Sequence, residues 1–343
     1  MISQTCVLEK ELKVWENILD MYGNPRLSIA RSFFLPLEQG DIPLLLEAFE
    51  FWQGYDEYGL IEGESTITGD KLYLAVKCSK RGNDVFAERL RRKLGFLHRW
   101  SNAEFFSLKS FSTHKVVKTR LLWVTLTYDS KRCSLHQAWL NCMAEYNKWI
   151  TNLRNKYGKI DVLRFPQPFP SQDGAAYGYP HMHLVLLFKE TEFSVFPRFE
   201  ENSKGETELA FRVKEKYEIE AQGKWHSFVD VKALKSARAV SNYVLKYAEN
   251  VCSGESSKAL INSAIMWLYC KQTYSMSGSF RISYHDLMVA KQGSKVQTTL
   301  EGAILDEWVW IWRGIRSGAE FDCAGEWFRE LSKEEFIRAV DRG

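Results

Sequence analysis

Apolar and polar positions alternate along this chain in a way that predicts a succession of strands and helices without internal repeats. Short runs rich in β-branched and aromatic residues predict strands at 71–78, 120–130, 159–165, 180–188 and, after a polar insertion, 224–234. Apolar positions that recur at helical spacing predict helices at 7–22, 84–100, 134–158 and 237–250. Strands joined through helices and hairpin-like loops favour an α+β fold, with a central antiparallel β-sheet and flanking helices.

The same pattern divides the chain into three regions, although no Gly/Ser-rich or Pro-rich linker separates them. Residues 1–110 mix helical and strand-like runs and are predicted to form an N-terminal α/β region, a candidate DNA-binding extension. Residues 111–290 carry the most regular succession of elements and are predicted to form the main domain. In residues 291–343, the aromatic-rich runs "LDEWVWIWRGIRS" and "EWFRELSKEEFIRAV" are interpreted as a C-terminal helical region.

The composition allows a large hydrophobic core, and the basic residues are unevenly distributed along the chain. The chain has 343 residues, of which 45% are hydrophobic, so it can bury a substantial core and disorder is excluded. A formal net charge of +3 is too balanced to indicate nucleic-acid binding by itself. Basic residues do cluster in the helix predicted at 84–100, and we predict phosphate contacts there by Arg89, Arg91, Arg92 and Lys93. The alternative is a solvated helix face.

Cysteine usage and hydropathy bear on the compartment. The seven cysteines include no Cys-x-x-Cys pair, which argues against a zinc ribbon and against a disulfide framework. We find no signal-peptide pattern, and no apolar run reaches the length of about 20 residues that a membrane-spanning helix needs. We therefore expect a cytoplasmic protein that does not contact membranes.

Two histidines open the strand predicted at 180–188. His181 and His183 are two positions apart, so their side chains point to the same face of a strand. Two imidazoles placed in this way can hold one metal ion. The alternative is a pair of histidines buried in the core, and the spacing alone does not decide between them.

Two tyrosines share one face of the helix predicted at 237–250. Tyr243 and Tyr247 are four residues apart, and Lys246 lies beside both. Tyrosine is common in this chain, with 15 copies, so the spacing by itself carries little information and packing tyrosines are the alternative. Their order relative to the other elements makes them informative.

Three elements occur in sequence: "WVTLTYD" at 123–129, "PHMHLVLLF" at 180–188 and "YVLKYAEN" at 243–250. In this order they resemble the motifs of the HUH endonucleases, most closely the rolling-circle replication initiators of small plasmids and viruses, including archaeal ones. The resemblance covers roughly residues 118–285. It implies that the central sheet is the RRM-like palm of that superfamily.

The resemblance also implies roles for single residues. His181 and His183 would bind Mn²⁺ or Mg²⁺, and a tyrosine would attack DNA. Tyr247 matches the nucleophile of single-tyrosine members, Tyr243 matches the additional tyrosine of two-tyrosine members, and Lys246 would supply positive charge. Where relatives carry a glutamate as third metal ligand, this chain offers Gln167, or Asp173 in the following loop, and the strand position favours Gln167.

The activity implied is the nicking and rejoining of single-stranded DNA at a replication origin, through a 5′-phosphotyrosine link and a free 3′-hydroxyl. No P-loop motif is present, so a helicase of the host or replicon would unwind the duplex, and a DNA polymerase would extend the hydroxyl. The host would be a prokaryotic cell. Alternatives are a transposase or mobilisation relaxase with the same chemistry, a non-enzymatic nucleic-acid-binding protein, and a metal-dependent hydrolase that activates water.

Overall fold

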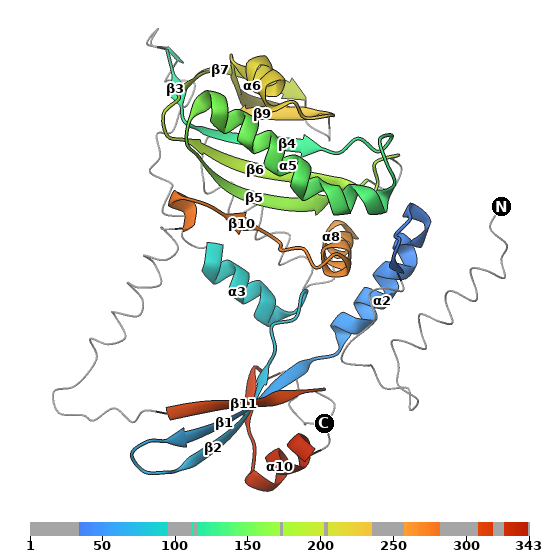
Figure 1. The fold of residues 1–343 in the computed structure, drawn as a ribbon, viewed down its shortest axis with the longest axis vertical. Helices are drawn as coiled ribbons and strands as arrows, with labels where there is room; N and C mark the ends of the chain where they lie inside the picture. Colours follow the sequence, from blue (N-terminus) through green and yellow to red (C-terminus); the bar gives the residue numbers. More distant parts are fainter. Residues whose placement is uncertain are drawn as a thin grey trace, which may run out of the picture.

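The computed structural model describes residues 34–94, 111–112, 116–171, 174–201, 205–234, 257–281, 308–317 and 326–341. Within these ranges the strands form two antiparallel sheets, one of eight strands and one of four. The two sheets lie at opposite ends of the molecule, and helices α2, α3 and α8 lie between them (Figure 1). No helix in the described part of the chain is long and apolar enough to span a membrane.

The larger sheet has the strand order β10-β5-β6-β4-β9-β8-β7-β3. Its strands are β3 (Lys118–Thr119), β4 (Leu121–Thr127), β5 (Ile160–Pro168), β6 (Pro180–Phe188), β7 (Phe193–Glu201), β8 (Thr207–Val213), β9 (Val229–Ala233) and β10 (Ser275–Met276). The sequence prediction of an α+β protein with a large antiparallel sheet is therefore confirmed. The polar insertion before β9 forms the β7–β8 hairpin and helix α6 (Lys216–Gly223).

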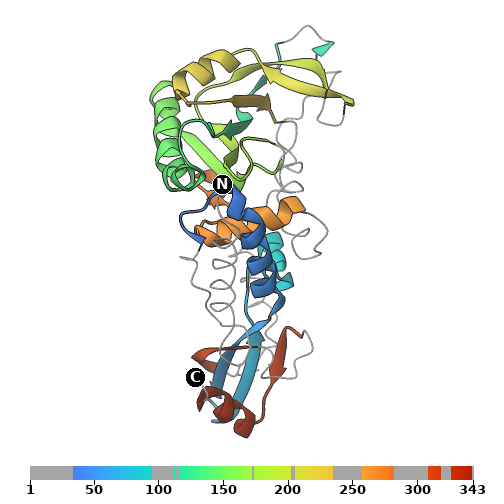
Figure 2. The same ribbon diagram turned by 90° about the vertical axis from the view of Figure 1, so that its right-hand side faces the viewer.

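Helix α5 (Leu135–Tyr157) covers one face of this sheet. Ser134 caps its start by accepting a hydrogen bond from the backbone of Gln137 at 3.3 Å, and Gly158 ends it at a positive φ of 76°. Helix α6 lies on the same side of the sheet (Figure 2), with Gly223 close against the indole of Trp149. A side chain at position 223 would collide with that indole, so glycine permits the close packing.

The core beneath α5 determines which way the histidines point. Met182, Leu184 and Leu186 are buried in one cluster with Trp149 of α5. Because side chains of a strand alternate between faces, the odd-numbered residues of β6 point to the opposite face. Burial of each such leucine stabilises the fold by roughly 1.5–3 kcal/mol, so the register of β6 is strongly fixed.

The opposite face is partly covered by helix α3 (Asp84–Leu94). Its Leu90 and Leu94 pack in one buried cluster with Leu163, Phe165 and Val185 of the sheet. Helix α2 (Ile42–Gly54) follows the short helix η2 (Gln39–Asp41). Together with α8 (Ser257–Leu268) and the first half of α5, α2 forms a separate hydrophobic core.

The smaller sheet joins distant parts of the chain. Its order is β11-β1-β2-β12, with β1 (Glu57–Ser65), β2 (Lys71–Lys77), β11 (Trp308–Ser317) and β12 (Phe328–Glu330), and helix α10 (Lys333–Asp341) packs against it. The prediction of a helical C-terminal region is wrong for the strands at 308–317 and 328–330 and correct for α10. The run "WVWIW" is rich in residues that favour strands, and being apolar at every position it shows no period.

Strand β5 is longer than the sequence predicts. The pattern places Pro166 and Pro168 in a loop, but β5 runs to Pro168 and stays in register with β6 throughout. Strand β10 pairs with β5 only at Leu163 and Arg164, so within the described chain the rest of β5 is an edge. Prolines are tolerated on edge strands because one side needs no ladder hydrogen bonds.

Candidate functional site

The two histidines lie side by side on the face of the sheet that α5 does not cover. Strand β6 runs between β4 and β5, and His181 stands opposite Thr127 on one side and Gln167 on the other. His183 stands opposite Thr125 in β4. The two imidazole centroids are 4.7 Å apart, with the rings nearly perpendicular at 86°.

Threonine hydroxyls hold both imidazoles. The Nδ1 atom of His181 is 3.1 Å from the hydroxyl of Thr127, and the Nδ1 atom of His183 is 3.2 Å from the hydroxyl of Thr125. A hydroxyl can donate or accept, so either tautomer satisfies this contact. When Nδ1–H donates to the threonine, Nε2 keeps its lone pair and can bind a metal ion, as is common for metal-bound histidines.

Burial keeps both histidines uncharged. His183 is only 8% exposed, and the ring of Trp123 lies 5.2 Å from its ring, centroid to centroid. Burial lowers the pKa of His181 to about 4, and burial together with the neighbouring His181 lowers the pKa of His183 well below its usual value. Both are therefore neutral near pH 7, the form that binds metals.

The structure brings Gln167 to this pair. It lies directly across from His181 in β5 and is buried, at 7% exposed. In the described ranges no group of three or more His, Cys, Asp or Glu side chains is arranged to hold a metal ion, so the candidate donors there are the two imidazoles and the amide oxygen of Gln167. Such a set fits a divalent ion that keeps open positions. Asp173, the alternative ligand, lies outside the described residues.

The predicted nucleophiles, Tyr243 and Tyr247, and the predicted helper Lys246 also lie outside the described residues. The segment that contains them begins directly after β9, the neighbour of β4. At the end of β9 the backbone N–H of Leu234 donates to the carbonyl of Leu121 at 3.2 Å. The chain therefore leaves the sheet at the end of β4 that is remote from the histidines.

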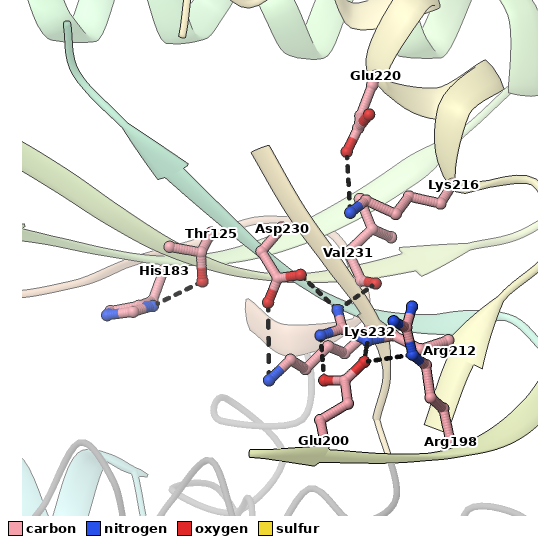
Figure 3. A network of polar contacts seen from close by, with 10 residues as sticks. All are labelled: Thr125, His183, Arg198, Glu200, Arg212, Lys216, Glu220, Asp230, Val231 and Lys232. Atoms are coloured by element: carbon pink, nitrogen blue, oxygen red, sulfur yellow. Dashed lines mark hydrogen bonds and ion pairs between the residues drawn. The ribbon is translucent and has the colours of Figure 1, made fainter. Parts of the chain in front are cut away.

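A charged network lies beside Thr125 and His183 on the same face of the sheet (Figure 3). Asp230 of β9 stands opposite Thr125 and forms ion pairs with Arg212 of β8 and with Lys232, the latter at 3.7 Å. Arg212 also binds both oxygens of Glu200 in β7, and this hydrogen bonding lowers the pKa of Glu200 despite its burial. Sequence reasoning missed these residues, because only the pairing of β7, β8 and β9 brings them together.

The four basic candidates of α3 separate into two pairs. Arg91 and Arg92 both form ion pairs with Glu88, the second at 2.8 Å, on the exposed side of the helix. Arg89 and Lys93, one helical turn apart, instead line a cavity of about 730 Å³. A four-residue spacing places two residues on one helix face, but the sequence does not show which face borders a cavity.

Comparison of the chain with protein-family models, with curated proteins and with solved structures finds no match. What this site can do therefore follows from its own side chains and their geometry.

Proposed function

We propose that this protein nicks and rejoins single-stranded DNA by metal-assisted tyrosine transesterification, as the HUH-type rolling-circle replication initiators do. The observation that carries the proposal is the His181–His183 pair. Both imidazoles are neutral, lie on one sheet face with centroids 4.7 Å apart, and are held at Nδ1 by threonine hydroxyls. This support fixes each ring and leaves its Nε2 atom for a metal ion.

His181, His183 and Gln167 would hold the ion. Mn²⁺ suits nitrogen ligands better than Mg²⁺, although both accept the amide oxygen of Gln167. When bound, the ion supplies Lewis acidity toward a non-bridging oxygen of the scissile phosphate. Trp123 and Phe169 flank the imidazoles, with ring centroids 5.2 Å from His183 and 5.5 Å from His181, and restrict how the rings can turn.

A tyrosine of the 243–247 pair would attack phosphorus through its phenol oxygen. The bond from phosphorus to the 3′-oxygen breaks as the bond from the phenol oxygen to phosphorus forms, so the 5′-phosphate is joined to the tyrosine. The phenol gives up its proton and the leaving 3′-oxygen takes one up, so the 3′ end becomes a hydroxyl with no net change in protons. A free phenol titrates near 10, so it is a poor nucleophile at neutral pH and needs help. The ammonium of Lys246 would favour the phenolate. Attack by a 3′-hydroxyl on the phosphotyrosine reverses the step and rejoins DNA.

Chain length supports this assignment of the nucleophile. From Leu121 to Thr127, β4 spans about 20 Å at roughly 3.4 Å per residue. Tyr247 is thirteen positions after Leu234, and thirteen residues at 1.5 Å each, the rise of an α-helix, correspond to about 20 Å. The segment is therefore long enough for Tyr247 to reach the histidines from the end of β9.

The partners proposed with this function are origin DNA in single-stranded form, a helicase and a DNA polymerase, in the cytoplasm of a prokaryotic host. A transposase or relaxase would share the chemistry and differ in the DNA it cuts. A non-enzymatic nucleic-acid-binding protein would form no covalent link.

The test is a denaturant-resistant adduct. The purified chain is incubated with Mn²⁺ and labelled single-stranded oligonucleotides tiled across its own replicon, and the products are separated on a denaturing gel. We expect an adduct that is lost in His181→Ala, in His183→Ala and in Tyr243→Phe or Tyr247→Phe.

The matched control is His136→Ala, because His136 contacts the hydroxyl of Tyr269 at 3.1 Å, away from the histidine pair. This variant should keep the adduct. Absence of any adduct from the wild type, with oligonucleotide binding intact, would instead favour the binding-protein alternative.

A further inference from the structure

A cavity of about 730 Å³ lies between α3 and residues 272–281, beside the β10 edge of the larger sheet. Its volume is in the range of small-molecule and cofactor sites and far exceeds what one bare phosphate needs. Among the described residues that line it, four are cationic and none is acidic; the four are Arg81, Arg89, Lys93 and Arg281.

The cations of this cavity divide by what they contact. Arg81 joins the two walls, because its guanidinium donates to the hydroxyl of Thr273 at 2.9 Å and to the carbonyl of Lys271 at 2.8 Å. Arg89, Lys93 and Arg281 form no ion pair in the described part of the chain.

This contrasts with Arg91 and Arg92 of the same helix, which share the carboxylate of Glu88. Like charges gathered around one cavity without carboxylates repel one another, and an anion relieves that repulsion. The cavity therefore fits an anionic ligand.

The remaining lining residues indicate what kind of anion it is. Phe86 and Tyr274 contribute aromatic side chains to the lining, with the guanidinium of Arg81 5.5 Å from the centroid of the Phe86 ring. Thr273, Ser275 and Gln272 contribute hydrogen-bonding groups. Arginine and lysine bind phosphate oxygens, whereas aromatic rings stack on nucleobases. A phosphate joined to a flat ring, that is a nucleotide, uses both sets of residues.

Position relates the cavity to the histidine pair. Ser275 of the cavity wall pairs with Arg164 of β5, and Gln167 is three residues further along the same strand, about 10 Å away. Leu90, another lining residue, packs in one cluster with Phe165, which stands opposite His183. The cavity thus lies beside α3, on the side of the sheet that carries the histidines, within a short stretch of DNA from the candidate metal ligands.

We propose that this cavity binds one nucleotide of the single-stranded DNA that reaches the His181–His183 site. Arg89, Lys93 and Arg281 hold the phosphate, and Tyr274 and Phe86 carry the base. The identity of the strand rests on the proposed function, whereas the preference for a nucleotide phosphate rests on the cavity itself. A free nucleotide offers the same chemistry, and the experiment separates the two sources.

The experiment measures binding of a labelled single-stranded oligonucleotide to the full chain by fluorescence anisotropy in EDTA, over a range of salt concentrations. The double variant Arg89→Gln/Lys93→Gln should weaken binding about tenfold and flatten the slope of log K against log salt by about 0.7 for each phosphate that is no longer neutralised. The matched control, Arg91→Gln/Arg92→Gln, removes the same charge from the same helix outside the cavity and should change affinity far less. Equal reductions of affinity in both doubles would overturn the proposal.

Two further binding measurements identify the kind of ligand. Tyr274→Leu keeps an apolar side chain and should weaken binding about tenfold because the ring no longer stacks on a base, and an unchanged affinity would overturn the role of the ring. A mononucleotide that competes as well as the oligonucleotide, at equal nucleotide concentration, would overturn the assignment to a DNA strand.

The adduct assay on the same proteins separates the two proposals. Cavity-dependent DNA binding without any adduct would contradict the nicking function alone. Adducts with unchanged affinity in Arg89→Gln/Lys93→Gln would contradict the cavity alone.

Discussion

Replacement of the two threonines that support the histidines should weaken metal binding without removing a ligand. Thr125→Val and Thr127→Val keep the shape of the side chain and delete only the hydroxyls that contact Nδ1 at 3.2 and 3.1 Å. Without this partner, the tautomer that leaves Nε2 ready for a metal loses a hydrogen bond worth about 0.5–1.5 kcal/mol. The imidazole also gains freedom to turn.

The expected size of the effect follows from these two changes. Removing a supporting hydrogen-bond partner of a metal-bound histidine costs about 10–100-fold in affinity, or roughly 1.4–2.7 kcal/mol. The two threonines support different histidines but the same ion. The loss of binding free energy in the double variant should therefore exceed the loss in either single variant and fall short of the sum of the two losses.

Mn²⁺ titration followed by electron paramagnetic resonance gives the dissociation constant directly. Thr151→Val is the matched control, because the hydroxyl of Thr151 is exposed on α5 and donates to the carbonyl of Asn147 at 2.7 Å, away from the site. Unchanged affinity in both threonine variants, together with loss of binding in His183→Ala, would refute the positioning argument. Loss of affinity in Thr151→Val would show that the assay reports on stability instead.

Three further predictions concern the buried carboxylate of Asp161, which is 2% exposed and accepts hydrogen bonds from the backbone of Ser279 at 2.8 Å and from Lys189 at 3.0 Å. Asp161→Ala should lower the free energy of unfolding by about 2–3 kcal/mol in urea denaturation, and an unchanged midpoint would contradict this. Burial alone would raise the pKa of Asp161, but the hydrogen bonds from Ser279 and Lys189 outweigh burial and lower it. The stabilisation by this carboxylate is therefore present above the unfolded pKa of about 3.9 and is lost as the pH falls further. The difference in free energy of unfolding between wild type and Asp161→Ala should narrow below about pH 4, and a wider difference there would refute the argument. Gly278→Ala should lower the free energy of unfolding by at least about 2 kcal/mol more than Gly69→Ala in the same urea measurement. Both glycines have positive φ, but only a Cβ at position 278 would collide with Asp161, at 1.7 Å from its carboxylate oxygen. Equal losses of stability would show that backbone strain alone accounts for the effect.

The strand that carries the histidines could be predicted from sequence because two features agree, the apolar run and the two-residue spacing of the histidines. The apolar residues Met182, Leu184 and Leu186 alternate with His181 and His183, and the structure buries the first set beneath α5. The short apolar run therefore indicates the strand, and the two-residue spacing places the histidines on one face of it. The supporting threonines also lie in a recognisable strand, but their pairing with the histidines depends on the register between β4 and β6, which no local pattern encodes.

Other features could not be predicted because they depend on distant segments. The ion pairs of Arg212 form only when β8 lies between β7 and β9, and strand β11 needs β1 as its partner. In β1, Gly59 and Gly63 leave space for the rings of Trp312 and Trp310, which a local interpretation of "WVWIW" does not reveal. Tertiary pairing thus decides between helix and strand where the sequence shows no period.

The most direct test of the account is to identify the residue that becomes joined to DNA. After incubation with Mn²⁺ and an origin oligonucleotide, nuclease and protease digestion followed by mass spectrometry would locate any nucleotide-modified peptide. The account predicts a peptide from the segment "YVLKY" with the 5′-phosphate on Tyr243 or Tyr247, absent when His181 and His183 are replaced by alanine. Modification at any other residue, or the same modification in the double histidine variant, would contradict it.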